Sequence, residues 1–270
     1  MQYYLLEDNM SYRDVFKNKA VIGMVHLMPL PGSPGYKGSV DQIIEAAFQD
    51  MRALEDGGAD SFIIENFGDV PYATQNEPIA MATMASVAGL IARETKLPFG
   101  INVQFNCTDW EWAMSYVTKA AFIRVEAFVE TRIGIHGVTE AKAPSLMRLK
   151  KAYPSDTMIF ADINTKHTFA VCDQPLDFSI TEAKESGADA LIVTGLLTGK
   201  SPTLDDVKEF KNLAGDMPVL LGSGVKASNI KDFFKVADGA IIGSSIKVNG
   251  DVNDRIDPER LKKLMDTVKG

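Results

Sequence analysis

The distribution of apolar residues along the chain follows one recurring pattern. An amphipathic segment ends at a glycine or another small residue, a short run of β-branched and apolar residues follows, and a polar loop comes next, as in EDGGADSFIIENFGD, KESGADALIVTGLLTG and VADGAIIGSS. Glycine suits a helix end because it adopts the left-handed conformation without a Cβ clash, and an uninterrupted apolar run is typical of a strand buried on both faces. The pattern therefore predicts the helix–strand unit of a parallel sheet.

Eight strands of this kind can be placed, about 20 to 40 residues apart. They are predicted at residues 20–26, 60–65, 99–104, 122–126, 158–162, 190–194, 219–221 and 240–242. Helical patterns lie between them. Ser39 is a candidate N-cap of one helix and Gly57 its end, and Thr203 would cap another with Asp206 at its third position.

The chain of 270 residues shows no change in composition and no linker rich in Pro, Gly or Ser. We therefore expect a single α/β domain, a (β/α)8 TIM barrel, with residues 1–18 as an N-terminal extension. A doubly wound open sheet is the alternative, because periodicity alone does not decide whether a parallel sheet closes.

Composition narrows the range of partners. The formal net charge of −8 argues against nucleic acid, because binding the phosphate backbone needs a basic face. The two cysteines, Cys107 and Cys172, lack the spacing of a metal site or a disulfide framework, which favours a reducing compartment. The first residues show no basic stretch followed by an apolar one, so we expect a cytoplasmic protein without a secretory signal.

The longest uncharged apolar segment, residues 78–92, is shorter than the roughly 20 residues that a membrane-spanning helix needs. No membrane insertion is therefore expected. As a helix this segment would be apolar on nearly all sides and would need cover on both faces, which predicts a homo-oligomer or, alternatively, packing between neighbouring helices.

Polar residues occupy the predicted carboxyl ends of the strands, which is where the active sites of TIM barrels lie. They are His26, Glu65, Asn66, Asn102, Asn106, Arg124, Glu126, Asp162, Asn164, Lys166, His167 and Thr194. Asp162 and Asn164 would project to the same side of an extended strand. We expect the asparagines and Thr194 to contact substrate.

Glycine and serine pairs follow the last two predicted strands. They are Gly222, Ser223 and Gly224 after the seventh strand and Gly243, Ser244 and Ser245 after the eighth. Glycines let the backbone approach phosphate oxygens, free N–H groups favour negative charge, and serine hydroxyls add donors. Because TIM barrels frequently hold phosphate at these two loops, the pattern predicts a small phosphorylated ligand.

Several strand-end groups are candidates for acid–base chemistry. Burial would raise the pKa of Glu65, which suits a general acid or base, and Asp162 is a second candidate proton carrier. His26, Arg124 and His167 would stabilise developing charge. Arg124 would clamp a substrate anion or, alternatively, neutralise a neighbouring carboxylate.

Other chemistries are open to the same residues. Glu126, with Glu65, Asp162 and His26, has the ligand types of a mixed divalent-metal site, so a metal is an alternative to a proton relay, while no cofactor is clearly indicated. Lys166 and Lys200 are candidates for Schiff-base formation, which we do not expect because neither lies within a strand, where burial would lower the pKa of the amine. His136, in GIHGV, is expected to face solvent.

Five stretches of the chain resemble the BtpA/SgcQ family. They are VIGMVHLMPLPGSPGY, IIENFGDVPY, ADALIVTGLLTGKSP, LLGSGVKASNI and ADGAIIGSSIKVNG. The resemblance extends over nearly the whole sequence. The resemblance implies a TIM barrel of the phosphate-binding kind. One branch of the family is linked to photosystem I biogenesis in cyanobacteria, and others accompany sugar uptake and sugar-phosphate metabolism. This chain departs from the family pattern at Phe105, where an arginine is common, and at Glu126, where an asparagine is usual.

Two functions are consistent with these features. The first is an enzyme that acts on a phosphorylated sugar or a similar metabolite by proton transfer next to a carbonyl, as an isomerase, epimerase or lyase. The second, implied by the resemblance, is a non-catalytic factor for the biogenesis of a photosystem or another membrane-protein complex, with a retained phosphate-ligand site.

Overall fold

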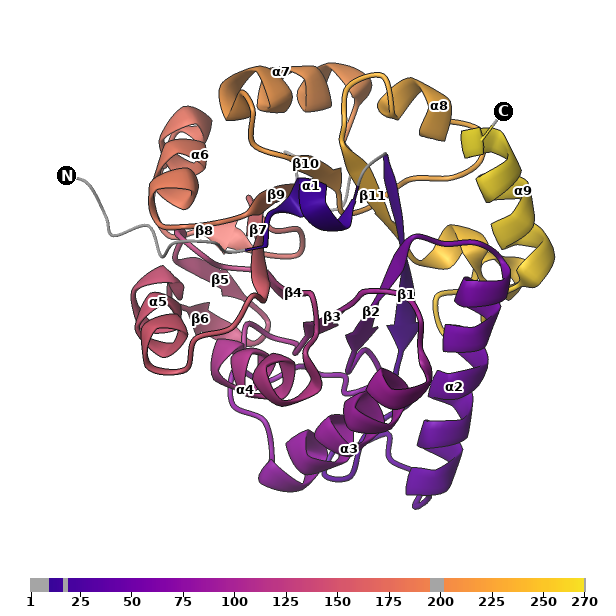
Figure 1. The fold of residues 1–270 in the computed structure, drawn as a ribbon. Coiled ribbons are helices and arrows are strands. Elements are labelled where there is room, and N and C mark those ends of the chain that lie inside the picture. Colours follow the sequence, from indigo (N-terminus) through magenta and orange to yellow (C-terminus); the bar gives the residue numbers. More distant parts are fainter. Residues whose placement is uncertain (1–9, 17–18, 195–201, 270) are drawn as a thin grey trace.

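Eight parallel strands close into a barrel in the computed structural model, which describes residues 10–16, 19–194 and 202–269 (Figure 1). The strands are β1 (Ala20–His26), β2 (Ser61–Glu65), β3 (Phe99–Asn102), β4 (Phe122–Val125), β7 (Met158–Ile163), β9 (Ala190–Val193), β10 (Val219–Leu221) and β11 (Gly239–Ile242). They neighbour one another in the order β1-β11-β10-β9-β7-β4-β3-β2. The predicted TIM barrel is confirmed, and the alternative of an open sheet is wrong because β1 pairs with both β2 and β11.

Helices surround the barrel on the outside (Figure 1). They are α2 (Val40–Asp56), α3 (Pro78–Glu94), α4 (Thr108–Thr118), α5 (Ala143–Ala152), α6 (Leu176–Glu185), α7 (Leu204–Ala214), α8 (Ile230–Phe233) and α9 (Pro258–Lys269). The predicted caps are confirmed: the Ser39 hydroxyl accepts a hydrogen bond from the backbone N–H of Gln42, and Thr203 forms a capping box with Asp206. Gly57 is the C-cap of α2.

The inside of the barrel is filled at the amino ends of its strands. Short helix α1 (Tyr12–Val15) packs there, with Tyr12 5.8 Å from Phe160 and Phe16 6.2 Å from Phe122 between ring centroids. Phe122 and Phe160 stack on each other at 4.3 Å. Tyr12 and Phe16 of the predicted extension therefore belong to the barrel core, and Val15 packs against it. Space for a ligand is left at the opposite end.

A small antiparallel sheet that the apolar pattern did not predict is built from the loops after β4 and β7. Its strands β5 (Arg132–Gly134), β6 (Gly137–Thr139) and β8 (Phe169–Ala170) are three residues long or shorter. Runs this short show no period of their own in a sequence. The sheet brings Ile135 and His136 to the carboxyl end of the barrel.

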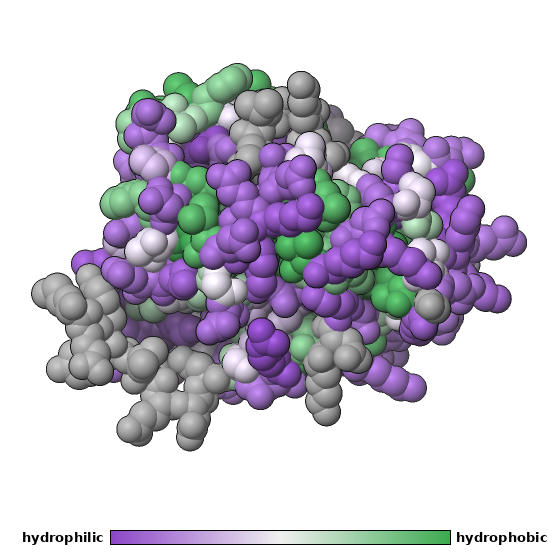
Figure 2. All heavy atoms as spheres, turned by 90° about the horizontal axis from the view of Figure 1, so that it is seen from above, coloured by the Kyte–Doolittle hydropathy of each residue, from purple (hydrophilic) through white to green (hydrophobic). Residues whose placement is uncertain are grey.

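Helix α3 contacts α2 and α4, and these contacts bury Met81, Met84, Val87 and Ile91. Packing between neighbouring helices thus covers much of its apolar surface, and the homo-oligomer stays a prediction. On the face shown in Figure 2, hydrophilic residues separate the apolar patches. Within the described ranges, none of the helices is both long and apolar enough to cross a membrane.

Candidate active site

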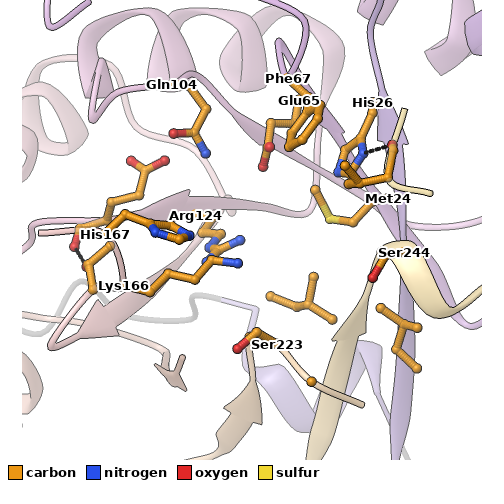
Figure 3. Close-up of a pocket in the computed structure, with 18 of the residues that line it drawn as sticks. Met24, His26, Glu65, Phe67, Gln104, Arg124, Lys166, His167, Ser223 and Ser244 are labelled. Carbon is orange, nitrogen blue, oxygen red and sulfur yellow. Dashed lines mark hydrogen bonds between the residues drawn. The ribbon is translucent and has the colours of Figure 1, made fainter. Parts of the chain in front are cut away.

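A cavity of about 890 Å³ lies at the carboxyl ends of the strands (Figure 3). The predicted site residues that line it are His26, Glu65, Arg124, Glu126, His167, Gly222, Ser223, Gly224, Gly243, Ser244 and Ser245. The other predicted residues lie behind its wall: Asn66, Asn102, Asn106, Asp162, Asn164 and Thr194. The barrel thus brings together residues from all parts of the chain, as expected for a closed sheet whose strand ends meet on one face.

Arg124 and Asp162 form a buried ion pair across the inside of the barrel. The guanidinium of Arg124, in β4, donates from Nε to Asp162 Oδ1 at 3.0 Å and from Nη2 to Asp162 Oδ2 at 2.9 Å. Both carboxylate oxygens are therefore bound to a cation that keeps its protons. The predicted role of Asp162 in moving protons does not fit this arrangement. We infer instead that Asp162 holds Arg124 in place.

Glu65 is the last residue of β2 and is only 3% exposed. Burial raises the pKa of its carboxyl group, and the cationic groups of Arg124 and Lys166 act in the opposite direction. In Figure 3 its carboxylate points into the cavity, toward the space that Arg124 and Lys166 face from the other side. A carboxyl group with a raised pKa beside cations is suited to give and take a proton.

Glu126 and Glu111 of α4 form a pair of buried carboxyl groups. The Asn102 side-chain amide donates to Glu126 Oε1 at 2.7 Å and to Glu111 Oε1 at 3.2 Å. Burial raises the pKa values of both carboxyl groups, and the Glu126 charge raises that of Glu111 further. Among the described residues, Glu111 Oε2 is buried without a hydrogen-bond partner. Sequence reasoning missed Glu111, although its position in the first turn after β3 points toward the strand end.

His26 is held as a neutral ring. Its Nδ1 lies 3.3 Å from the carbonyl oxygen of Val252. Because a carbonyl oxygen only accepts, this contact assigns the proton to Nδ1 and leaves a lone pair on Nε2. The ring stacks on Phe67 at 4.1 Å between centroids. Burial and the Lys247 cation lower the pKa of His26 to about 3. The predicted role in stabilising negative charge therefore does not fit, since a neutral ring in this tautomer offers an acceptor.

Lys166 and His167 follow β7 on the other side of the cavity. The Lys166 side chain runs into the cavity beside Arg124 (Figure 3), and burial, followed by the Arg124 charge, lowers the pKa of its amine. The sequence argument that burial would leave this lysine unaffected was therefore wrong. His167 is exposed at the cavity wall, and burial of part of its ring lowers its pKa. Lys200 lies outside the described residues.

The glycine loops form one wall of the cavity. Gly222, Ser223 and Gly224 follow β10, and Gly243 leads from β11 into the 3-10 helix η1 (Ser244–Ile246). In the described part of the chain, the backbone N–H groups of Ser223, Gly224, Ser244 and Ser245 make no hydrogen bond. They are donors left for a ligand.

Two of the three serine hydroxyls are already used. Ser223 Oγ donates to the carbonyl oxygen of Thr194 at 2.6 Å, and Ser245 Oγ donates to that of Val225 at 2.7 Å. A hydroxyl has one proton to donate, so these two tie the loops together. The prediction that serine hydroxyls add donors is supported for Ser244 alone among the described serines of these loops, because its hydroxyl is exposed and makes no hydrogen bond there.

The two strand-end glycines differ in how much space the surrounding protein leaves for a side chain. A Cβ on Gly222 would lie 2.5 Å from Thr194 Cγ2 and 2.7 Å from Ile192 Cγ2, so packing against β9 requires this glycine. A Cβ on Gly243 would lie 3.6 Å from His26 Cε1 and 3.8 Å from Met24 Cγ, which is ordinary contact. Protein packing therefore leaves room for a side chain at Gly243 and none at Gly222.

The asparagines predicted to contact substrate brace the loops instead. Asn66 Oδ1 accepts from the Gln104 backbone at 2.7 Å, and Asn106 Oδ1 accepts from the Ala127 backbone at 2.9 Å. Asn164 Oδ1 accepts from Arg132 Nη2 at 2.9 Å, away from the cavity. The prediction failed at Asn164 because the strand ends at Ile163 and Asn164 has φ of +56°, which breaks the alternation of sides.

Asn102 and Thr194 serve the same purpose. Asn102 links the two buried carboxyl groups, as described above, and Thr194 Oγ1 accepts from the Lys166 backbone at 3.3 Å. Buried loop backbone needs partners, and short polar side chains at strand ends supply them.

His136 was expected to face solvent, but it lies at the turn between β5 and β6 and lines the cavity. Its ring stacks on Phe105 at 3.8 Å between centroids. A mixed metal site of His26, Glu65, Glu126 and Asp162 is not formed: nowhere in residues 10–16, 19–194 and 202–269 do three His, Cys, Asp or Glu side chains gather closely enough to hold a metal ion. The guanidinium of Arg124 binds Asp162 directly and interacts electrostatically with Glu65 and Glu126.

The sequence of this chain matches a family of known proteins. The profile of the BtpA family matches residues 17–270. An uncharacterized protein of Methanocaldococcus jannaschii is 40% identical over 252 residues, which cover 93% of this chain and 95% of that protein. The photosystem I biogenesis protein BtpA of Synechocystis sp. is 35% identical over 250 residues, which cover 92% of this chain and 87% of that protein.

Solved structures of other TIM barrels are similar in fold. N-(5'-phosphoribosyl)anthranilate isomerase from Pyrococcus furiosus superposes with a TM-score of 0.56 at 14% identity, covering 93% of this chain and 98% of that one. Dihydropteroate synthase from Xanthomonas albilineans superposes with a TM-score of 0.58 at 13% identity, covering 93% and 90%. At these identities the likeness establishes the barrel fold.

Proposed function

The chain belongs to the BtpA family, and from this premise we propose that it is an enzyme acting on a phosphorylated sugar or a similar small metabolite by proton transfer next to a carbonyl group. Isomerisation, epimerisation and carbon–carbon cleavage are the reactions of this class. The observation that carries the proposal is that unpaired backbone donors of the glycine loops and the buried carboxyl group of Glu65 line the same cavity.

The ligand's phosphate is assigned to the glycine loops. Four backbone N–H groups, those of Ser223, Gly224, Ser244 and Ser245, are left without partners in the described part, and backbone donors of this kind bind phosphate oxygens in many proteins. TIM barrels frequently place phosphate at the loops after the seventh and eighth strands, which are β10 and β11 here. One structural neighbour is named as an isomerase of a phosphoribosyl compound, which agrees with such a ligand.

Proton transfer is assigned to Glu65. Its carboxylate would remove a proton from the carbon next to the carbonyl group, and its raised pKa favours returning the proton afterwards. Arg124, fixed in place by Asp162, would stabilise the negative charge that develops on the carbonyl oxygen. Glu126 is a second carboxyl group of raised pKa at the cavity, and His26 Nε2 would accept a hydrogen bond from a substrate hydroxyl.

The test uses isotope exchange, because it needs no knowledge of the product. Phosphorylated ketoses and aldoses would first be screened for thermal stabilisation of the protein, and those that bind would be incubated with it in deuterium oxide. Proton NMR should show loss of the signal from the carbon next to the carbonyl group. Glu65→Gln should slow this exchange by about 100-fold or more while its circular dichroism spectrum stays that of the wild type. Full exchange in Glu65→Gln would refute the assignment.

The Synechocystis relative favours a second candidate function, because it is named as a photosystem I biogenesis protein. In that case this chain is a non-catalytic factor that retains a phosphate-ligand site as a sensor. The same experiments separate the two functions: a factor of this kind binds a phosphorylated compound and catalyses no isotope exchange in it.

A further inference from the structure

Among the residues that the structure describes, three lysines at or next to the cavity can be compared, and their surroundings differ. Lys226 is exposed at the rim. Lys247 is 1% exposed behind the wall, where its amine donates to the Asp254 carbonyl oxygen at 2.9 Å and lies 3.7 Å from Asp50 Oδ2. Lys166 is half-buried, with its side chain inside the cavity (Figure 3).

The Lys166 amine has no ion-pair or hydrogen-bond partner among the residues that the structure describes. Two carboxyl groups lie near enough to act on this amine, those of Glu65 and Asp162. Asp162 is bound through both oxygens to Arg124, and Glu65 forms no ion pair with the amine in the described part of the chain. Arg124 is thus a fixed cation next to an amine, and it disfavours the ammonium form together with burial, while Glu65 and Asp162 favour that form. Desolvation and an adjacent cation are the two means by which proteins make a lysine nucleophilic.

We propose that Lys166 is a catalytic nucleophile, whose amine forms an imine with the carbonyl carbon of the phosphorylated ligand in this cavity. The inference rests on the proposed function and adds to it the substrate class. The ligand must carry a free ketone or aldehyde group besides its phosphate, as ketose phosphates, aldose phosphates and phosphorylated keto acids do.

The chemistry is balanced by groups at the cavity. The lone pair of the neutral Lys166 amine attacks the carbonyl carbon, the C=O π electrons move to oxygen, and a proton passes from nitrogen to that oxygen to give a carbinolamine. The protonated Glu65 carboxyl group then gives its proton to the hydroxyl, which leaves as water while the C=N bond forms. The resulting Glu65 carboxylate removes the proton from the adjacent carbon, and the electron pair moves into the iminium to give a neutral enamine. Reprotonation at carbon and addition of water regenerate the free amine.

An imine explains a feature that simple enolate chemistry leaves without a role. The iminium nitrogen takes up the electron pair within the covalent adduct. The lysine amine must therefore be free of an ion pair and must lie near the group that moves the proton, which is Glu65. Lys247, which is held in that way, has the environment of a structural lysine.

The test is reductive trapping with two probes, dihydroxyacetone phosphate and pyridoxal 5′-phosphate, which are a ketone and an aldehyde that carry phosphate. Each is incubated with the full-length protein and sodium borohydride, and the adduct is located by intact-mass and peptide mass spectrometry. Labelling should fall on Lys166, persist in the matched control Lys226→Met, and drop by about tenfold or more in Lys166→Met and Lys166→Arg. The Lys166→Arg variant keeps a cation at this position, so it checks that charge alone does not explain the loss.

Two results would overturn the proposal. One is that neither probe labels Lys166, or that labelling is undiminished in Lys166→Met. The other is that Lys166→Arg keeps the wild-type rate of isotope exchange. In both cases exchange that still depends on Glu65 would leave the proposed enzyme standing without a covalent step, whereas the absence of all exchange would remove the proposed function itself.

Discussion

The guanidinium of Arg124 binds both carboxylate oxygens of Asp162 inside the barrel, with contacts of 3.0 and 2.9 Å. This pair determines what the other charged groups of the cavity can do. It removes Asp162 from proton transfer, places a permanent cation opposite Glu65, and leaves the Lys166 amine without a carboxylate partner in the described part of the chain.

Removing one partner of this pair should be far worse than removing both. Asp162→Leu leaves the buried Arg124 cation without its hydrogen-bonded partner, and we expect it to lower the free energy of unfolding by about 3–5 kcal/mol. Arg124→Met combined with Asp162→Leu should cost much less, because two apolar side chains can pack in the same volume. Urea denaturation of the two single variants and the double variant measures the coupling.

The exposed pair of Lys208 and Asp205 offers a control, since its side chains are 52% and 90% exposed. Asp205→Ala should change stability little, because solvent screens exposed ion pairs. If Asp162→Leu were no more harmful than this control, the buried pair would not have the organising role assigned to it.

Substitution by alanine should lower the stability of the protein at Gly222 and leave it almost unchanged at Gly243. Gly222→Ala places a Cβ 2.5 Å from Thr194 Cγ2, so we expect overpacking to cost about 1–3 kcal/mol of stability. Gly243→Ala places its Cβ in ordinary contact with His26 and Met24, so we expect stability within about 0.5 kcal/mol of the wild type.

Ligand binding should separate the same two variants a second time. If phosphate sits against these loops, the Cβ at position 243 takes space that the ligand needs, and thermal stabilisation by dihydroxyacetone phosphate or inorganic phosphate should be lost in Gly243→Ala. Unchanged stabilisation by these compounds in Gly243→Ala would move the phosphate away from the loop after β11.

Most of the fold could be predicted from the sequence, because buried parallel strands leave a plain signal. The apolar runs at residues 20–26 and 219–221, for example, coincide with β1 and β10, and the Ser39 and Thr203 caps follow from local hydrogen bonding. The sheet of β5, β6 and β8 was missed because strands of two or three residues have no measurable period.

The site was predictable only in part, because a sequence shows which residues reach the strand ends and not what they contact there. The glycine loops and Glu65 line the cavity as expected. The asparagines do not, because buried loop backbone competes for short polar side chains. Glu111 and His136 were missed because a helix and a hairpin carry them to the site from outside the strands.

The bracing role of Asn106 leads to a stability prediction. Its side chain exchanges hydrogen bonds with the backbone of Ala127, at 2.9 Å to the N–H and 3.2 Å to the carbonyl oxygen, and its φ is +59°. Asn106→Gly tolerates this backbone and loses only the side-chain bonds, which should cost about 1–3 kcal/mol. Asn106→Ala loses the same bonds and adds strain at a positive φ, so it should be the less stable of the two.

Chemical denaturation with both variants tests this reasoning. Equal stability of Asn106→Gly and the wild type would mean that the side-chain bonds contribute nothing, and the residue would again be a candidate for substrate contact.

The neutral ring of His26 should make stability depend on pH in a specific range. Its pKa in the folded protein is about 3, below the usual value near 6.5, so the ring takes up a proton when the chain unfolds in mildly acidic solution. The contribution to stability is complete above about pH 6.5 and is lost as the pH falls toward 3. The slope can reach about 1.4 kcal/mol per pH unit for one proton.

Comparison with His26→Asn isolates this effect from the other titrating groups, because asparagine still offers a donor toward the Val252 carbonyl oxygen and does not titrate. Between pH 6.5 and 4 the free energy of unfolding of the wild type should fall more steeply than that of His26→Asn. Above pH 7 the two curves should have the same slope. His167→Asn serves as the matched control, since His167 is exposed and should give a smaller difference. Parallel pH profiles for the wild type and His26→Asn would mean that the ring takes up a proton as readily in the folded protein as in the unfolded chain, and His26 would then return as a candidate for stabilising negative charge in the cavity.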